Sequence, residues 1–240
     1  LRRPMILDLD DATYIDAVSP VYGRLASPLK WRGKTDALIR RANVVTCGNE
    51  TIAAHVGAKA VVVPTVVDLR VFRPGPKNDG VPVIGWIGTH STQPYFERLL
   101  PVLERLARET AFQVKVVGGE NWSLAREPDD FRALDIGVYP IADDAWSAGK
   151  SGLKAVQYMA SGVPFVMSPV GVCATMGIAG NTHFLATTDD EWLDALRRLV
   201  ADRALRERMG AAGRAFAEAH YSLDKQADVL ASLIRKVAGC

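Results

Sequence analysis

The chain has 240 residues, 48% of them hydrophobic and 23% charged, which is enough for one large or two small globular domains. Its net charge is only +2, so overall electrostatic attraction gives no reason to expect binding to nucleic acid or to a membrane surface. The three cysteines, Cys47, Cys173 and Cys240, lack the spacing of a disulfide framework or a zinc site. The sequence also shows neither a membrane-spanning stretch nor a signal-peptide core, so we expect a cytoplasmic protein.

The first 80 residues predict a small α/β unit. Short apolar runs at residues 4–8, 43–46 and 60–63 are typical of buried strands. Helices are expected around residues 34–41 and from Asn49 to near Gly57. Residues 72–80 contain two prolines and two glycines, which favours a linker. We therefore expect one domain over residues 1–80 and another over residues 81–240.

Apolar runs alternate with amphipathic helical patterns from residue 81 onward. This alternation predicts an α/β domain with a Rossmann-like, doubly wound parallel sheet. Pro101 marks a bend or a shifted start in the first helix of this domain. Thr188 and Glu191 have the spacing of a capping box, and Asp202 is placed to cap the next helix. The expected strands are residues 83–88, 112–119, 135–140, 165–168 and 183–186.

The stretch from residue 149 to residue 164 reads as a loop, a helix and a tight turn between two apolar strands. Gly149 or Ser151 can cap the helix, and Gly162 with Pro164 predicts its end. The free N–H groups and the dipole at such a helix start favour phosphate. Lys150, Lys154 and Gln157 follow the spacing i, i+4, i+7, so one helical face carrying them would suit a nucleoside diphosphate.

An alternative remains open for the same residues. Two lysines at helical spacing also occur on an ordinary solvated helix face, and short motifs often match by chance.

Residues 158–164, which read Tyr-Met-Ala-Ser-Gly-Val-Pro, resemble the signature of family-4 glycosyltransferases. These are retaining enzymes of GT-B fold that use nucleotide-sugar donors. Their pattern has two glutamates where this chain has Gly149 and Gln157, and the Gly-Lys-Ser-Gly-x-Lys sequence resembles a variant subset. The resemblance implies that Gln157 holds the donor ribose hydroxyls, since an amide both donates and accepts. The family's first glutamate contacts the transferred sugar, and Gly149 has no side chain for that role.

The first segment resembles the end of the family's N-terminal, acceptor-binding domain. In the family, a Pro-x-x-Val-Asp-x-x-x-Phe-x-Pro sequence links the two domains. Its fixed positions are occupied here by Pro64, Val67, Asp68, Phe72 and Pro74. The resemblance implies a truncated N-terminal domain that lacks its earlier part, including that domain's own glycine-rich loop and catalytic side chains. A donor-binding domain with a final crossover helix is expected to follow it. We expect residues 1–80 either to pack tightly on residues 81–240 or to form a homodimer through an exposed sheet edge.

The loop after the strand at residues 83–88 is a second candidate for donor binding, because open α/β sheets bind ligands at such loops. Thr89, His90 and Ser91 stand where the family has basic residues, which shifts the charge to Lys150 and Lys154. Those two lysines are the candidate catalytic residues. The candidate donor-binding residues are Gly88, Thr89, His90, Tyr139, Pro140, Gly149, Ser151, Gly152, Leu153 and Gln157.

The acidic sequence at Asp8, Asp10 and Asp11 has two further readings. It resembles the nucleophile motif of haloacid-dehalogenase phosphatases, but Ala12 stands where threonine is expected. It also contains Asp-x-Asp, the metal motif of the other glycosyltransferase fold, but it is predicted in the other domain, away from the donor site. We therefore expect no metal and no cofactor.

The resemblance implies transfer of a sugar from a nucleoside diphosphate sugar to a hydroxyl acceptor with retention, without a metal. The alternative is a nucleotide-sugar-binding module without efficient turnover, and a phosphatase is a more distant third. The expected partners are the nucleotide-sugar donor and an unidentified hydroxyl acceptor, with no nucleic acid and no transmembrane segment.

Overall fold

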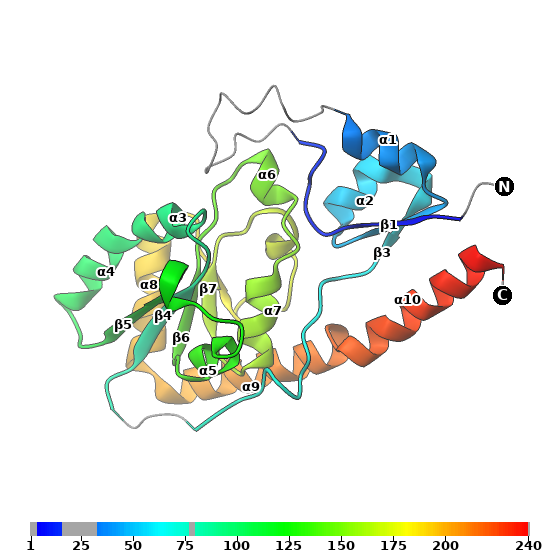
Figure 1. Cartoon of the computed structure of the whole chain (residues 1–240). Coiled ribbons are helices and arrows are strands. Elements are labelled where there is room, and N and C mark those ends of the chain that lie inside the picture. Colours follow the sequence, from blue (N-terminus) through cyan, green and yellow to red (C-terminus); the bar gives the residue numbers. More distant parts are fainter. Residues whose placement is uncertain (1–3, 16–32, 77–79, 240) are drawn as a thin grey trace.

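The computed structural model describes residues 4–15, 33–76 and 80–239, and two separate parallel sheets organise them (Figure 1). The N-terminal sheet has the order β1-β2-β3, with every pair parallel. Among the residues that the structure describes, two helices lie between its strands in the chain. Its elements are β1 (Ile6–Leu9), α1 (Lys34–Arg41), β2 (Val44–Cys47), α2 (Glu50–Val56) and β3 (Ala60–Val62).

The C-terminal sheet has five parallel strands in the order β5-β4-β6-β7-β8. The chain leaves β4 for β5 on one side and then crosses back to place β6 on the other. The carboxyl ends of β4 and β6 therefore flank a topological switch point, where such sheets bind ligands. The strands are β4 (Val83–Ile87), β5 (Gln113–Val117), β6 (Ile136–Tyr139), β7 (Phe165–Met167) and β8 (Phe184–Leu185).

Helices cover both faces of this sheet, which confirms the predicted α/β class. Ile84 and Trp86 of β4 face the core beneath two helices, whereas Ile87 joins the core on the other face. This alternation is the strand period of two, and burial on both faces explains the apolar runs in the sequence. The helices are α3 (Gln93–Glu97), α4 (Leu100–Ala107), α5 (Glu127–Arg132), α6 (Ala145–Ala148), α7 (Leu153–Ala160), α8 (Asp189–Ala201), α9 (Arg203–His220) and α10 (Leu223–Ala238).

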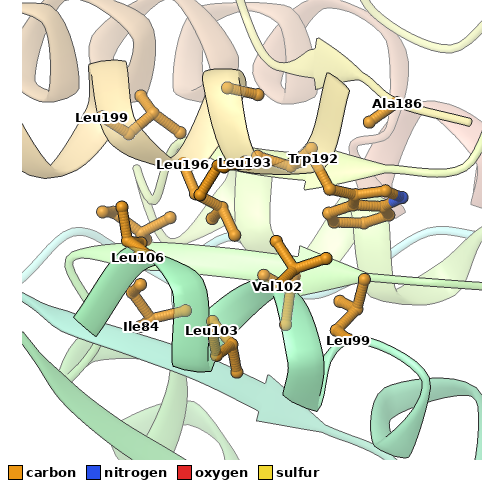
Figure 2. Packing of buried hydrophobic residues seen from close by; sticks show 14 of the residues in the cluster. Ile84, Leu99, Val102, Leu103, Leu106, Ala186, Trp192, Leu193, Leu196 and Leu199 are labelled. Atoms are coloured by element: carbon orange, nitrogen blue, oxygen red, sulfur yellow. The ribbon is translucent and has the colours of Figure 1, made fainter. Parts of the chain in front are cut away.

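One core lies between α4, α8 and the sheet, and Figure 2 shows the leucines and valine of the two helices facing one another across it. Leu103 and Leu106 of α4 face Leu196 and Leu199 of α8, all of them buried. Trp192 closes the end of this layer beside Leu99 (Figure 2). Because the buried side chains recur every three or four residues, the amphipathic pattern in the sequence predicted this packing.

The segment between the two sheets is fastened to α9 through one side chain. The Arg214 guanidinium donates to the carbonyl oxygens of Leu69 and Phe72 at 3.2 and 2.7 Å, and to that of Ala160 at 2.7 Å. A charged donor that satisfies three carbonyls stabilises their arrangement more than a neutral one would. The described part of the segment that joins the two sheets is therefore held in place by hydrogen bonds to Arg214.

Helix α10 extends from α9 toward the side of the N-terminal sheet (Figure 1). It has no buried residue along its described length, and Leu230 and Ile234 are among its exposed hydrophobic side chains. Among the described helices, none is both long and apolar enough to cross a membrane.

Candidate functional site

A cleft of about 900 Å³ lies between the N-terminal and C-terminal units, at the switch point of the C-terminal sheet. Gly88 follows β4 on one side, and Tyr139 with Pro140 ends β6 on the other. The N-terminal unit contributes Asp10 and Asp11. The other residues that line the cleft are Ile15, Trp86, Ile87, Thr89, Ser91, Thr92, Tyr95, Ile141, Asp144, Ala145, Trp146, Lys150, Ser151, Gly152, Leu153 and Lys154.

A smaller cavity of about 420 Å³ lies by the amino ends of β6 and β7, beside α9. Two of its arginines already donate to carbonyl groups, Arg206 to Leu199 and Val200, and Arg214 to Ala160. Ligands of open α/β sheets bind at the carboxyl ends of the strands. We therefore place the candidate site at the larger cleft.

The glycine loop before α7 forms one wall of the cleft. Gly152 is the N-cap and takes the left-handed region with φ of 73°, where a Cβ would also lie 2.4 Å from the Met176 sulfur. Neither Gly149 nor Ser151 caps the helix, so that prediction was wrong. Because the glycine offers no capping side chain, the first N–H groups of α7 remain available to a ligand, and the helix dipole favours an anion there.

Lys150 lies in this loop, three residues before α7 begins at Leu153. The prediction that it shares one helical face with Lys154 and Gln157 was therefore wrong, since only the latter two are helical. Its Nζ lies 5.9 Å from the ring centroid of Trp146. Within the described part of the chain, Lys150 forms no ion pair within 4 Å, so its charge is available at the cleft.

Lys154 also lines the cleft, but Glu127 already neutralises it. Its Nζ donates to Glu127 Oε1 at 2.7 Å, and the two side chains are only 20% and 9% exposed. The Nζ also lies 5.3 Å from the centroid of the Phe131 ring. A pair with so little solvent exposure is held in place by the cost of leaving either charge alone.

Glu127 connects three groups near the cleft. Besides Lys154, its Oε1 accepts from Trp122 Nε1 at 3.1 Å, and its Oε2 accepts from Gln157 Nε2 at 3.1 Å. The sequence analysis missed this residue. No spacing rule connects Glu127 at the start of α5 with two side chains on α7, so only the fold brings them together.

Gln157 is buried and does not line the cleft, being only 3% exposed. Its Nε2 is used by Glu127, whereas no described residue is a hydrogen-bond partner of its Oε1. A buried acceptor without a donor costs free energy unless a water or a ligand satisfies it.

The remaining predicted donor-site residues divide into two groups. His90 is exposed in the turn before α3 and is not part of the cleft lining. Gly149 is buried and does not line the cleft either; a Cβ added to it would lie 2.2 Å from the Cβ of Ala12. Those that do line the cleft are Gly88, Thr89, Tyr139, Pro140, Ser151, Gly152 and Leu153.

The N-terminal unit holds the glycine loop directly. Asn49 caps α2 by accepting from Ile52 N at 2.9 Å, and its Nδ2 donates to the carbonyl oxygens of Gly149 and Lys150 at 3.1 and 3.0 Å. The two units therefore pack together, as one of the two expected arrangements required. Sequence analysis identified the cap but gave no sign of its second role.

Asp10 and Asp11 lie on the cleft, although the acidic motif was predicted to be distant from the donor site. The reason is that β1 ends at Leu9, so these residues follow the carboxyl end of a strand that points toward the glycine loop. Burial raises the pKa of Asp11 above its usual value, and the charge of Lys150 only partly offsets this. Within the described residues, no group of three or more His, Cys, Asp or Glu side chains is arranged to hold a metal ion.

Sequence comparison connects the chain with glycosyltransferases. Residues 101–202 match the profile of the family described as Glycosyl transferases group 1. A D-inositol 3-phosphate glycosyltransferase of Nocardia farcinica is 26% identical over 191 residues, covering 62% of this chain and 41% of that protein. One from Actinosynnema mirum is 28% identical over 238 residues, covering 82% and 56%. The chain thus spans about half the length of the curated relatives that it matches.

Solved structures show the same fold at low sequence identity. The Anabaena protein HepE, in complex with UDP, superposes with a TM-score of 0.68 at 16% identity, covering 98% of this chain and 72% of that one. Sucrose-phosphate synthase from Thermosynechococcus elongatus gives 0.65 at 18% identity, covering 92% and 64%. The two-sheet arrangement is that of the GT-B fold, and residues 101–202 are similar to the glycosyl transferases group 1 family.

Proposed function

We propose that the cleft binds a nucleoside diphosphate sugar and that the protein transfers the sugar to a hydroxyl acceptor with retained anomeric configuration. One observation carries this proposal: the Lys150 ammonium lies beside the open start of α7. This ammonium forms no ion pair with a described residue, unlike that of Lys154. A cation beside free helix N–H groups is a site for a phosphate anion.

Charge on the departing diphosphate is what such a site must stabilise. Lys150 is the group best placed to do so, because Lys154 is already paired with Glu127. The backbone N–H groups of Ser151 and Gly152 add fixed donors that need no rearrangement during the reaction. Lys154 contributes less than an unpaired lysine would, since Glu127 cancels much of its field.

Gln157 is the candidate for the ribose hydroxyls of the donor. Its Oε1 is a buried acceptor without a described partner, and Glu127 fixes the amide so that this oxygen points away from the shared hydrogen bond. A ribose hydroxyl would satisfy it, although the side chain must first become accessible, because it is only 3% exposed. Pairing the amide with a nearby carboxylate keeps acidic character at this position, where the family has a glutamate.

Calorimetry with UDP, GDP and ADP tests the site, using the wild-type chain, Lys150→Ala and the matched control Lys236→Ala on exposed α10. Lys150→Ala should weaken binding of the preferred diphosphate by about 1.5–3 kcal/mol, the range for hydrogen bonds to charged groups. The control should bind like the wild type. Equal affinity of Lys150→Ala and wild type would refute the phosphate assignment.

A second measurement separates an enzyme from the alternative, a nucleotide-sugar-binding module without efficient turnover. Gly149 and the Lys154–Glu127 pair leave few free groups for catalysis, which is the observation that favours the module. Release of nucleoside diphosphate from the bound donor, followed over time, identifies turnover. The anomeric configuration of the product, measured by NMR, then tests retention.

A further inference from the structure

The two walls of the cleft carry opposite charges. The Lys150 ammonium and the start of α7 form the cationic wall, and the Asp10 and Asp11 carboxylates belong to the facing N-terminal unit. A diphosphate on the cationic wall would be repelled by these carboxylates, because like charges at short range destabilise each other. The acidic wall therefore suits a part of the substrate that is neutral and donates hydrogen bonds.

Asp11 lies in a tightly packed turn. Its neighbour Ala12 is only 1% exposed and packs against Gly149, where an added Cβ would lie 2.2 Å from the Ala12 Cβ. The turn is closed by hydrogen bonds from Thr13 N to Asp11 O at 2.8 Å and from Ile15 N to Ala12 O at 2.9 Å. The backbone that carries Asp11 is thus fixed against the phosphate loop, so its carboxylate has a defined position relative to Lys150.

The environment of Asp11 is consistent with a carboxylate at the inner wall of the cleft. Asp11 is half-buried whereas Asp10 is exposed. Burial raises the pKa of Tyr139, which lines the cleft at the end of β6, and the charges of Cys173 and then Asp11 raise it further. Asp11 therefore lies within electrostatic reach of both the cationic wall and the end of the sheet.

We propose that Asp11 accepts hydrogen bonds from hydroxyl groups of the transferred sugar and so selects nucleotide sugars over free nucleoside diphosphates. This inference rests on the proposed function, because it takes the diphosphate to lie at Lys150. The sugar is the neutral, hydroxyl-rich part of the donor bonded directly to that diphosphate. A carboxylate is a strong acceptor for such hydroxyls, with two oxygens to receive them.

The test compares the affinities for UDP and UDP-glucose, and for GDP and GDP-mannose, in the absence of any acceptor. The wild type, Asp11→Asn and the control Asp228→Asn, on exposed α10 and outside the cleft lining, are measured by calorimetry. In Asp11→Asn, the affinity for the sugar nucleotide relative to the free diphosphate should fall about tenfold or more. Affinity for the free diphosphate should stay equal or rise, because a negative charge near it has been removed.

The control Asp228→Asn removes the same unit of charge from an exposed position outside the cleft, and its affinity ratio should change less than about twofold. Continued binding of the free diphosphate also shows that Asp11→Asn is folded. An unchanged ratio in Asp11→Asn, or an equal change in both variants, would overturn the role of Asp11 and leave the diphosphate site standing. A wild-type chain that binds none of the four ligands would instead overturn the proposed function itself.

Discussion

Asn49→Asp separates the two roles of a single side chain. The aspartate can still accept from Ile52 N and cap α2, because carboxylates and amides are about equally good N-caps. It cannot donate to the carbonyl oxygens of Gly149 and Lys150, which lie 3.1 and 3.0 Å from the present Nδ2. Two net hydrogen bonds of about 1 kcal/mol each are lost, and a carboxylate faces two carbonyl groups, so we expect the free energy of unfolding to fall by about 2–4 kcal/mol.

Urea denaturation of the wild type, Asn49→Asp and Asn49→Ser measures this loss, with circular dichroism reporting the helices. Asn49→Ser serves as the control because serine is also a good N-cap but is too short to carry the amide donor. Both variants should lose stability, and the aspartate variant should lose more, because it adds electrostatic repulsion. Nucleotide affinity should fall in parallel, since the loop that precedes α7 loses its support. If Asn49→Asp unfolds at the same urea concentration as the wild type, the contact between the units does not stabilise the fold.

The remaining two predictions concern buried titratable groups. Glu127→Gln should lower the free energy of unfolding by about 3 kcal/mol, because it leaves the ammonium of Lys154 without its counterion. The double variant Glu127→Gln, Lys154→Met should recover part of this loss in the same urea assay. For His183, burial lowers the pKa from 6.5 to about 4, so between these pH values the unfolded chain binds more protons than the folded one. Stability should therefore decline as pH falls through this window, by on the order of 3 kcal/mol in total, and His183→Gln should remove this part of the pH dependence in urea titrations at pH 7, 5.5 and 4.5.

The regular elements could be predicted from the sequence because local patterns determine them. Thr188 and Glu191 form the expected capping box at α8, and Asp202 caps α9 by accepting from Leu205 N. Pro101 stands in the first turn of α4, where its missing N–H costs nothing, so the shifted start was the right alternative. In each case a few neighbouring residues carry the whole signal.

The beginning of α7 shows where local patterns were insufficient. Helical spacing grouped Lys150 with Lys154 and Gln157, but Gly152 adopts a left-handed conformation and delays the helix to Leu153. Spacing cannot predict this, because glycine permits several loop conformations and tertiary contacts select among them. The sequence thus pointed to the stretch that lines the cleft but not to the separate positions of its two lysines.

The acidic partners were missed for a related reason. Glu127 is 27 residues from Lys154, and Asp11 lies in the other unit, so neither contact has a sequence period. The resemblance to family-4 glycosyltransferases drew attention to glutamates missing from positions 149 and 157. The structure instead shows a carboxylate hydrogen-bonded to Gln157 and another across the cleft from Lys150. The Asp11→Asn variant tests whether the second of these carboxylates contacts the donor.

The glycine loop before α7 is supported by the N-terminal unit. Asn49 holds two of its carbonyl groups, and Ala12 fills the space beside Gly149 so closely that no side chain fits there without movement. A loop supported in this way needs less rearrangement when a ligand binds, and this lowers the entropic cost of binding. The described part of the N-terminal unit, residues 4–15 and 33–76, therefore helps to shape the cleft as well as lining it. The absence of a side chain at position 149 follows from this packing, because any residue with a Cβ would push the two units apart at the point where the cleft is built.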